Sequence, residues 1–178
     1  MAELIGLTGK SGAGKTRLFR EIVNAAKSAG LTVYGFFCPA VFEGGKKIGI
    51  EVTLLPGGEV FLLGSHEKRK NWQPIGRWWM NPSVFELANE HLKSFSSSDL
   101  LFIDEIGPAE IDGNQGWTEA LNLLKEDSFR IGVVAFRPAF IGYFKENYPG
   151  IKIINLDEDY QSEIRSLMER FCKPEITG

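Results

Sequence analysis

Residues 9–16 read Gly9-Lys10-Ser11-Gly12-Ala13-Gly14-Lys15-Thr16, a stretch that fits the pattern G-x-x-x-x-G-K-[ST]. An apolar run over residues 4–8 precedes it, and apolar residues at helical spacing follow it: Leu18, Ile22, Ala25, Ala26 and Ala29. A glycine-rich loop between a strand and a helix turns backbone N–H groups and the positive end of the helix dipole toward a polyphosphate. In such a loop Lys15 reaches the β- and γ-phosphates, and the Thr16 hydroxyl ligates Mg²⁺. All eight residues are therefore expected to bind ATP or another nucleoside triphosphate, with Mg²⁺ as cofactor.

The composition is that of an ordinary soluble domain. The chain has 178 residues, 43% of them apolar, and a formal net charge of −3, so it can close a core and has no global attraction to nucleic acid or to an anionic membrane. Two cysteines, Cys38 and Cys172, cannot build a dense disulfide framework, and no apolar run approaches the roughly 20 residues of a membrane span. The N-terminal residues show no leader sequence. We expect one unprocessed, cytoplasmic domain over residues 1–178, with no membrane or nucleic-acid partner.

Apolar runs alternate with helical patterns along most of the chain. Further short apolar runs are typical of buried strands, over residues 31–38, 99–104, 130–136 and 151–154. Helical spacing recurs over residues 83–95, 117–124, 139–147 and 158–171. This alternation predicts an α/β fold of three layers, with a mostly parallel central sheet and helices on both faces.

Residues 40–80 interrupt that alternation. Two strand-like segments, 47–55 and 59–63, flank Pro56-Gly57-Gly58, and this pattern predicts an antiparallel hairpin insertion. Residues 64–81 are expected to form a long loop in which three tryptophans are interleaved with cations, namely Trp72, Trp78 and Trp79 with Lys68, Arg69, Lys70 and Arg77. This loop could close as a lid over the triphosphate, or contact nucleic acid with the tryptophans as stacking platforms. The sequence favours a third alternative, a solvated loop whose tryptophans pack onto the core.

An acidic pair ends one of the expected strands. Four apolar residues over 100–103 lead into Asp104 and Glu105, and ligands of parallel α/β sheets lie outside the carboxyl ends of the strands. The pair and the phosphate loop should therefore converge on one site. Asp104 would hold Mg²⁺ mostly through water, while Glu105 would orient or deprotonate an attacking water, which favours hydrolysis. The alternative is that the pair only caps a turn or helix after the strand.

Two cations near the expected site have more than one possible role. Arg137 follows the strand at 130–136, so it could stabilise charge developing on the γ-phosphate, stack on a base, or form a structural ion pair at a helix start. Lys10 is either solvent-facing or reaches the nucleotide of a second subunit, as in some dimeric ATPases with a similar loop. The chain is accordingly expected to be a monomer or a homodimer.

Other polar residues lack a pattern that points to chemistry. His66 and His91 have no spaced metal-ligating partners and are expected to be structural or exposed. Residues 155–157 read Asn155-Leu156-Asp157 without the lysine of the Asn-Lys-x-Asp element, so the sequence does not support guanine selection of the standard kind.

Taken together, three segments resemble the THEP1 family of small nucleoside-triphosphatases: residues 6–16, Gly35-Phe36, and the run Ile103-Asp104-Glu105-Ile106-Gly107-Pro108-Ala109-Glu110. The last is the most specific of them. The resemblance implies a RecA-like P-loop core and slow, Mg²⁺-dependent hydrolysis of ATP, GTP and other nucleoside triphosphates, with loose base selectivity. The chain departs from the family pattern at Ala40-Val41-Phe42, where the family usually has Glu-Val-Arg, and at Ala109, where methionine is common.

Three other functions use the same motifs. A small-molecule kinase would use residues 68–77 as a lid and the hairpin as an acceptor pocket, although a water-directing Glu105 argues against it. A nucleotide-binding accessory module, similar to the GTP-binding proteins of molybdopterin cofactor synthesis, would turn over only with a partner. A nucleic-acid-binding ATPase would be stimulated by single strands and inhibited by salt.

Overall fold

The computed structural model describes residues 2–113 and 115–171. Cys172 lies outside these ranges. In chain order the elements are β1 (Glu3–Thr8), α1 (Lys15–Ser28), β2 (Val33–Phe37), β3 (Ala40–Glu43), β4 (Lys46–Leu55), β5 (Val60–Ser65), β6 (Gln73–Ile75), β7 (Trp78–Met80), α2 (Pro82–Lys93), β8 (Ser98–Ile106), α3 (Pro108–Ile111), α4 (Thr118–Leu123), β9 (Phe129–Phe136), the 3₁₀ turn η1 (Pro138–Phe140), α5 (Ile141–Asn147), β10 (Lys152–Asn155) and α6 (Gln161–Phe171).

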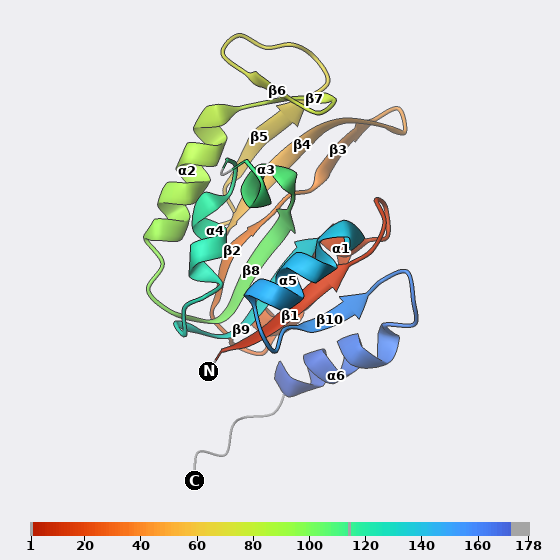
Figure 1. The fold of residues 1–178 in the computed structure, drawn as a ribbon, viewed down its shortest axis with the longest axis vertical. Coiled ribbons are helices and arrows are strands. Elements are labelled where there is room, and N and C mark those ends of the chain that lie inside the picture. Colours follow the sequence, from red (N-terminus) through yellow and green to blue (C-terminus); the bar gives the residue numbers. More distant parts are fainter. Residues whose placement is uncertain (1, 114, 172–178) are drawn as a thin grey trace.

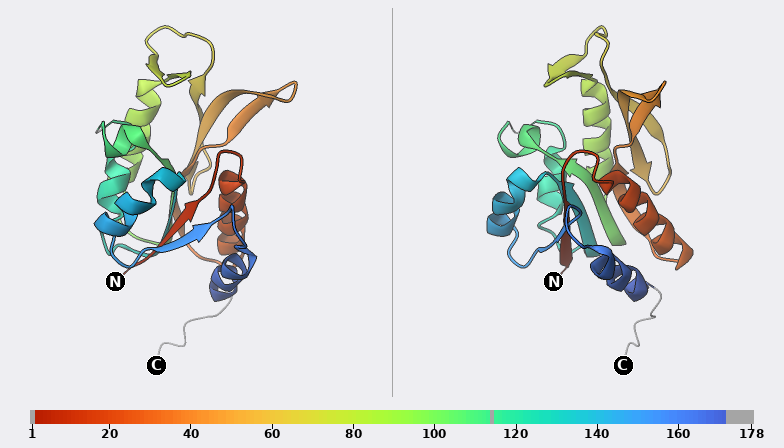
Figure 2. Two further views of the ribbon diagram at one scale, coloured as in Figure 1. Left: turned by 45° about the vertical axis from the view of Figure 1, so that its right-hand side comes forward. Right: turned by 90° about the vertical axis from the view of Figure 1, so that its right-hand side faces the viewer.

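A single mixed sheet runs through the molecule in the order β10-β1-β9-β8-β2-β4-β5-β7-β6, with β3 paired to β4 (Figure 1). The strands from β10 to β2 are parallel to their neighbours, whereas those from β4 onward pair antiparallel. Helices α1 and α6 cover one face of the parallel half, and α2, α4 and α5 cover the other (Figure 2). The expected three-layer α/β architecture is confirmed.

The parallel half is covered on both faces, which explains its uninterrupted apolar runs. Residues 100–103 of β8 are all fully buried, alternating between the two apolar clusters. From α1, Phe19 packs edge-on against Phe102 at 5.6 Å between ring centroids. On β2, Gly35 has φ +112, and a Cβ there would lie 1.9 Å from the Phe102 carbonyl oxygen, so only glycine lets these two strands pair so closely.

The antiparallel half differs from expectation in its details. The hairpin around residues 56–58 is confirmed as β4 and β5. A second hairpin joins β3 to β4 through Gly44 and Gly45, which have φ values of 54° and 77°; the sequence analysis missed β3. The prediction of a long loop over residues 64–81 is wrong in part. Strand β5 continues to Ser65, and β6 and β7 form a further antiparallel pair within this segment.

The tryptophans of this segment do not pack onto the core as expected. Neither apolar cluster of the described residues includes Trp72, Trp78 or Trp79. Instead each indole lies under a cation, 5.1 to 5.6 Å from the ring centroid, in the pairs Arg69–Trp72, Lys47–Trp78, Arg77–Trp78 and Lys68–Trp79. The three indoles are half-buried, and cation–π contacts with surface lysines and arginines add to what orders this segment.

The two histidines are structural or exposed, as expected. His91 stacks on Tyr34 with ring centroids 4.4 Å apart, and its Nε2 lies 2.9 Å from the Leu55 carbonyl oxygen. His66 is exposed and stacks on Trp78. Among the described residues, none of the helices combines the length and apolar character that crossing a bilayer requires.

Candidate active site

The phosphate loop connects β1 to α1 in an open, glycine-dependent conformation. Gly12 and Gly14 have φ values of 85° and 93°, and a Cβ at either position would meet no atom within 4 Å. Glycine adopts these left-handed conformations without strain, and because it has no side chain the loop interior stays open at both positions. The Lys15 ammonium donates to the Gly9 carbonyl oxygen at 2.7 Å and to the Lys10 carbonyl oxygen at 3.2 Å. The carbonyl oxygens of the loop thus hold the Lys15 ammonium in the place where a phosphate group is expected to bind.

The loop is also tied to the segment after β10. The Lys10 N–H donates to Asp157 Oδ2 at 2.9 Å, and Asp157 N–H donates to Asn155 Oδ1 at 3.1 Å. The amide of Asn155 in turn donates to Glu158 at 2.8 Å. These polar groups brace the loop from one side. The Lys10 side chain is exposed, and its contact with a second subunit stays a prediction.

Asp104 lies at the carboxyl end of β8, directly beneath the start of α1. The Thr16 hydroxyl donates to Asp104 Oδ2 at 3.0 Å, and the Cys38 N–H donates to the same oxygen at 2.9 Å. The carboxyl is 2% exposed. Burial raises its pKa to about 6, although the two hydrogen bonds lower it. A buried hard oxygen beside a hydroxyl, at the base of an anion-binding loop, is a donor set suited to Mg²⁺.

Glu105, the next residue, has a strained backbone. Its φ is +69°, in the left-handed region, and the β8–β9 register shifts between Ile103 and Ile106. Consecutive side chains of a regular strand point to opposite faces. Here the break lets Glu105 reach the cavity beside the phosphate loop while Asp104 is buried under the same loop. Residues held in sparsely populated backbone conformations cluster at active sites and ligand clamps.

Arg137 comes from the strand that separates the two motifs. Strand β9 lies between β1 and β8, so its carboxyl end falls between the phosphate loop and the acidic pair. The Arg137 guanidinium donates to Glu105 Oε1, at 3.1 Å from Nη2 and 3.3 Å from Nε. Because the two side chains are 62% and 48% exposed, this ion pair contributes little to stability. The ion pair considered in the sequence analysis exists, and it lies inside the candidate site.

A cavity of about 430 Å³ brings these residues together. Its lining consists of Ser11, Gly12, Gly14, Lys15, Thr16, Arg17, Arg20, Cys38, Pro39, Ala40, Phe42, Lys47, Glu105 and Arg137. Five of these residues are cations and one is an acid, so the cavity favours a polyanion. The β3–β4 hairpin projects beyond the sheet above the phosphate loop (Figure 2) and supplies Phe42 and Lys47. Sequence reasoning missed both, because the hairpin carries no motif.

Glu110 holds the segment that follows the acidic pair. Its carboxylate is 7% exposed and accepts from the Gly107 N–H at 2.9 Å and the Trp117 N–H at 3.1 Å. Burial raises its pKa, and these hydrogen bonds lower it. The last acid of the Asp-Glu-Ile-Gly-Pro-x-Glu run is therefore a brace for the loop after β8, away from the cavity lining.

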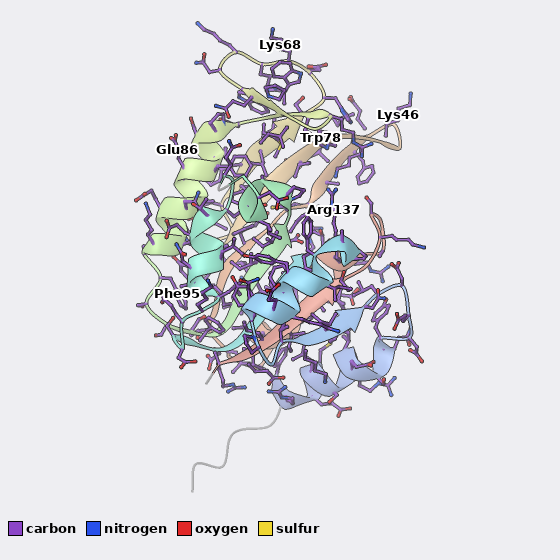
Figure 3. All side chains as sticks on the ribbon, in the orientation of Figure 1. Lys46, Lys68, Trp78, Glu86, Phe95 and Arg137 are labelled. Carbon is purple, nitrogen blue, oxygen red and sulfur yellow. The ribbon has the colours of Figure 1, made fainter. Side chains whose placement is uncertain are left out.

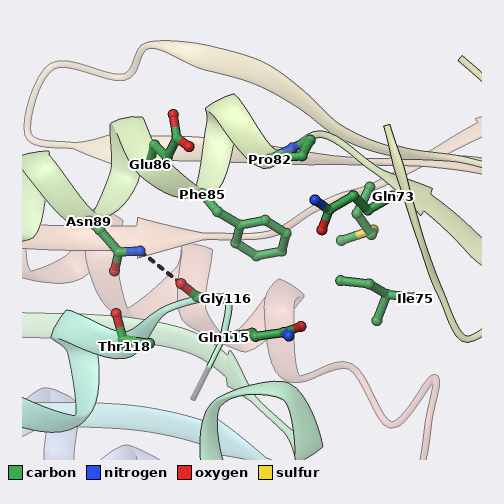
Figure 4. A pocket seen from close by; sticks show the side chains of 10 residues that line it. Gln73, Ile75, Pro82, Phe85, Glu86, Asn89, Gln115, Gly116 and Thr118 are labelled. Carbon is green, nitrogen blue, oxygen red and sulfur yellow. Dashed lines mark hydrogen bonds between the residues drawn. The ribbon is translucent and has the colours of Figure 1, made fainter. Parts of the chain in front are cut away.

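A second cavity, of about 270 Å³, lies between β6, α2 and residues 115–118 (Figure 4). Phe85 forms one wall, and Asn89 closes the end by donating from Nδ2 to the Gly116 carbonyl oxygen at 2.7 Å. Its lining includes no residue of the phosphate loop, β8 or β9. Figure 3 places Arg137 near the middle of the molecule and Glu86, which lines this second cavity, at its edge on α2. The two cavities are distinct.

A phosphate loop between strand and helix, with an acidic pair two strands away on a mostly parallel sheet, defines a P-loop NTPase fold. The family model described as NTPase matches residues 4–167, and the chain belongs to this NTPase family. The nucleoside-triphosphatase THEP1 of Hyperthermus butylicus is 36% identical over 62% of this chain and 59% of its own length. The cancer-related nucleoside-triphosphatase homolog of Bos taurus is 32% identical over 62% of this chain and 63% of its own. The aligned part spans about three fifths of the length of these relatives.

Two solved structures share the fold. The solution structure of a human cancer-related nucleoside triphosphatase superposes with a TM-score of 0.72 at 24% identity, covering 95% of this chain and 97% of that one. The crystal structure of THEP1 from Aquifex aeolicus gives 0.71 at 21% identity, with 96% and 99% covered. At these identities the likeness establishes the fold, and the THEP1 resemblance and the expected fold class are confirmed.

Proposed function

We propose that this chain hydrolyses nucleoside triphosphates to nucleoside diphosphates and phosphate, with Mg²⁺ and with little selection among bases. The observation that carries the proposal is the strained Glu105, whose carboxylate lines the cavity beside the phosphate loop. A carboxylate there can accept the proton of an attacking water. Names of relatives that include nucleoside-triphosphatase support the same reaction.

The residues present suit Mg²⁺. Thr16 and Asp104 offer a hydroxyl and a carboxylate oxygen 3.0 Å apart, next to the cradle for the phosphates. Among residues 2–113 and 115–171, no three His, Cys, Asp or Glu side chains gather into a metal cluster, in keeping with an ion held by few protein groups, water and substrate oxygens. When bound there, Mg²⁺ would neutralise negative charge on the phosphate oxygens.

Each side chain of the cavity has a distinct part in the proposed reaction. Lys15 exchanges its two loop carbonyl partners for phosphate oxygens and neutralises developing charge. Arg137 leaves Glu105 for the γ-phosphate, which frees the carboxylate to orient a water in line with the phosphorus. The water oxygen bonds to the γ-phosphorus as the bond to the bridging oxygen breaks, and the proton of the water passes to Glu105.

Weak base selection follows from how the polar groups after β10 are used. Asn155 already bonds Glu158 and the Asp157 N–H, and Asp157 Oδ2 accepts from the phosphate-loop backbone, so most of their bonding groups have partners. Selection by hydrogen bonding needs polar groups that a wrong base would leave unpaired. Broad selectivity is expected from the family resemblance, and these existing hydrogen bonds support it.

The test is phosphate release from ATP, GTP, CTP and UTP, each with and without Mg²⁺. We expect release from all four within about tenfold of one another, and only with Mg²⁺. Glu105→Gln should lower kcat by roughly 10²- to 10⁴-fold while nucleotide still binds, and Lys15→Ala should weaken binding itself. Glu90→Gln, on the exposed side of α2, is the matched control and should leave turnover unchanged.

Other outcomes of the same assay would point to the alternatives. Unchanged phosphate release by Glu105→Gln would show that this residue is not the base. ADP formation that depends on an added acceptor, in a screen of nucleosides, sugars and cofactor precursors, would identify a kinase. Turnover that appears only with a partner protein would identify an accessory module.

A further inference from the structure

Lys47 lies on the β3–β4 hairpin and lines the candidate site. Strand β3 pairs with β4 around the glycine turn, with Phe42 opposite Lys47 and Glu43 opposite Lys46. A register shift between Val41 and Phe42 bends the hairpin, and such bulges commonly re-aim side chains next to active sites. Lys47 lines the same cavity as Glu105 and Arg137. Its neighbour Lys46 is exposed and does not line the cavity.

The Lys47 ammonium forms no ion pair with any carboxylate in the part of the chain that the structure describes. It lies over the face of Trp78, with Nζ 5.1 Å from the ring centroid. Burial lowers its pKa, the charge of Glu105 raises it, and the charges of Arg77 and Arg137 lower it again. A half-buried cation beside two other cations is unfavourable unless an anion joins them.

The position of Lys47 indicates which part of the anion it meets. Lys47 lines the cavity with Glu105 and Arg137, and it lies near enough for both of their charges to act on its pKa. In the proposed function Glu105 directs water to the terminal phosphorus, and Arg137 is paired with Glu105. Charge that develops on the transferring group is stabilised best by donors fixed before the reaction. The Lys47 ammonium, which lies over the Trp78 ring, is positioned in this way before any substrate binds.

We propose that Lys47 is a further catalytic residue, which contacts the γ-phosphoryl group and stabilises the charge that develops on it during transfer to water. The proposal rests on the proposed function. It makes the β3–β4 hairpin part of the active site, and it lets one chain supply two cations, Lys47 and Arg137, to the transferring group. The bonds formed and broken, and the transfer of the proton to Glu105, are those already given.

Lys47→Met and Lys46→Met form a matched pair, since the two residues are adjacent on one strand and point to opposite faces. We expect Lys47→Met to lower kcat for ATP by on the order of 10²- to 10³-fold, with the Kd of a non-hydrolysable ATP analogue changed less than about threefold. Binding of ADP with aluminium fluoride and Mg²⁺, which imitates the transferring group, should weaken as much as kcat falls. Lys46→Met should change none of the three, and Lys47→Arg should restore part of the rate.

Several outcomes separate the hypotheses. Wild-type turnover with an unchanged kcat in Lys47→Met would overturn the role of Lys47 and leave the proposed function intact. An increase in KM alone would mean that Lys47 only binds the ground state, which also overturns the proposal. A wild-type protein that binds the ATP analogue but releases no phosphate from any nucleotide would overturn the proposed function, and the catalytic role with it. Lys47→Gln, with circular dichroism and a thermal melt of each variant, guards against loss of fold.

Discussion

The parallel and antiparallel halves of the sheet use their residues differently. In the parallel half, the central strands β8 and β9 are buried almost throughout, between apolar clusters on both faces. In the antiparallel half lie Phe42, Ile48 and Val60, large apolar side chains that are 64%, 39% and 54% exposed. Most of the buried apolar area, and so most of the stability, belongs to the first half. The candidate active site lies where the halves meet, with the phosphate loop from one and Lys47 from the other.

Truncating one phenylalanine in each half tests this division most strongly. Phe102 is fully buried against Phe19, so Phe102→Ala should lower the free energy of unfolding by roughly 3–5 kcal/mol through lost burial and a residual cavity. Phe42→Ala should change it by less than about 0.5 kcal/mol, because its ring is already solvated. Urea unfolding of both variants measures the difference. Equal losses would show that the hairpin is as much a part of the folding core as β8.

The same division explains how much of the fold could be predicted from the sequence. Parallel strands covered on both faces become continuous apolar runs, and these were legible at residues 100–103 and 130–136. The phosphate loop is legible because its chemistry is local: glycines, a lysine and a threonine at fixed spacing. Asp104 and Glu105 could be placed near it because parallel strands end at one edge of the sheet.

The features that escaped prediction depend on distant contacts. Strands β3, β6 and β7 are three or four residues long and mostly half-exposed, so they lack a period that could be counted. Lys47 reaches the cavity only because a bulge and a glycine turn direct the hairpin over the loop. Arg137 pairs with Glu105 because β9 lies between β1 and β8. The sequences of the two segments do not predict this strand order.

Within the parallel half, substitution of Asp104 should have a smaller effect on the free energy of unfolding, and one opposite in sign to its effect on turnover. The pKa of Asp104 is about 6 in the folded protein, against an ordinary value of 3.8. Between these values the folded protein binds more protons than the unfolded one, so the free energy of unfolding falls as pH rises through this window. Asp104→Asn should therefore stabilise the protein at pH 7.5 by up to about 3 kcal/mol, yet abolish Mg²⁺-dependent turnover.

The measurement for Asp104 is urea unfolding at pH 4 and at pH 7.5, without Mg²⁺ or nucleotide. The gain in stability should be small at the lower pH, where the carboxyl is protonated in the folded state and partly protonated in the unfolded state. Asp112→Asn, at an exposed acid in the loop after α3, is the control and should show no such dependence. If Asp104→Asn is less stable than wild type at pH 7.5, the Asp104 carboxylate stabilises the folded protein.

The smallest effect is expected in the antiparallel half, where cations stack on indoles at the surface. Lys68 is exposed and lies 5.4 Å from the Trp79 ring centroid, and a contact of this kind contributes about 0.5–1 kcal/mol at exposed sites. A double-mutant cycle with Lys68→Met and Trp79→Leu should give a coupling energy in that range. Because Met keeps a long apolar stem, the cycle reports the charge on the ring more than the packing of the stem. A coupling above about 2 kcal/mol would mean that this segment is fixed almost as firmly as the buried strands, and the contrast between the halves would then lie in chemistry and not in rigidity.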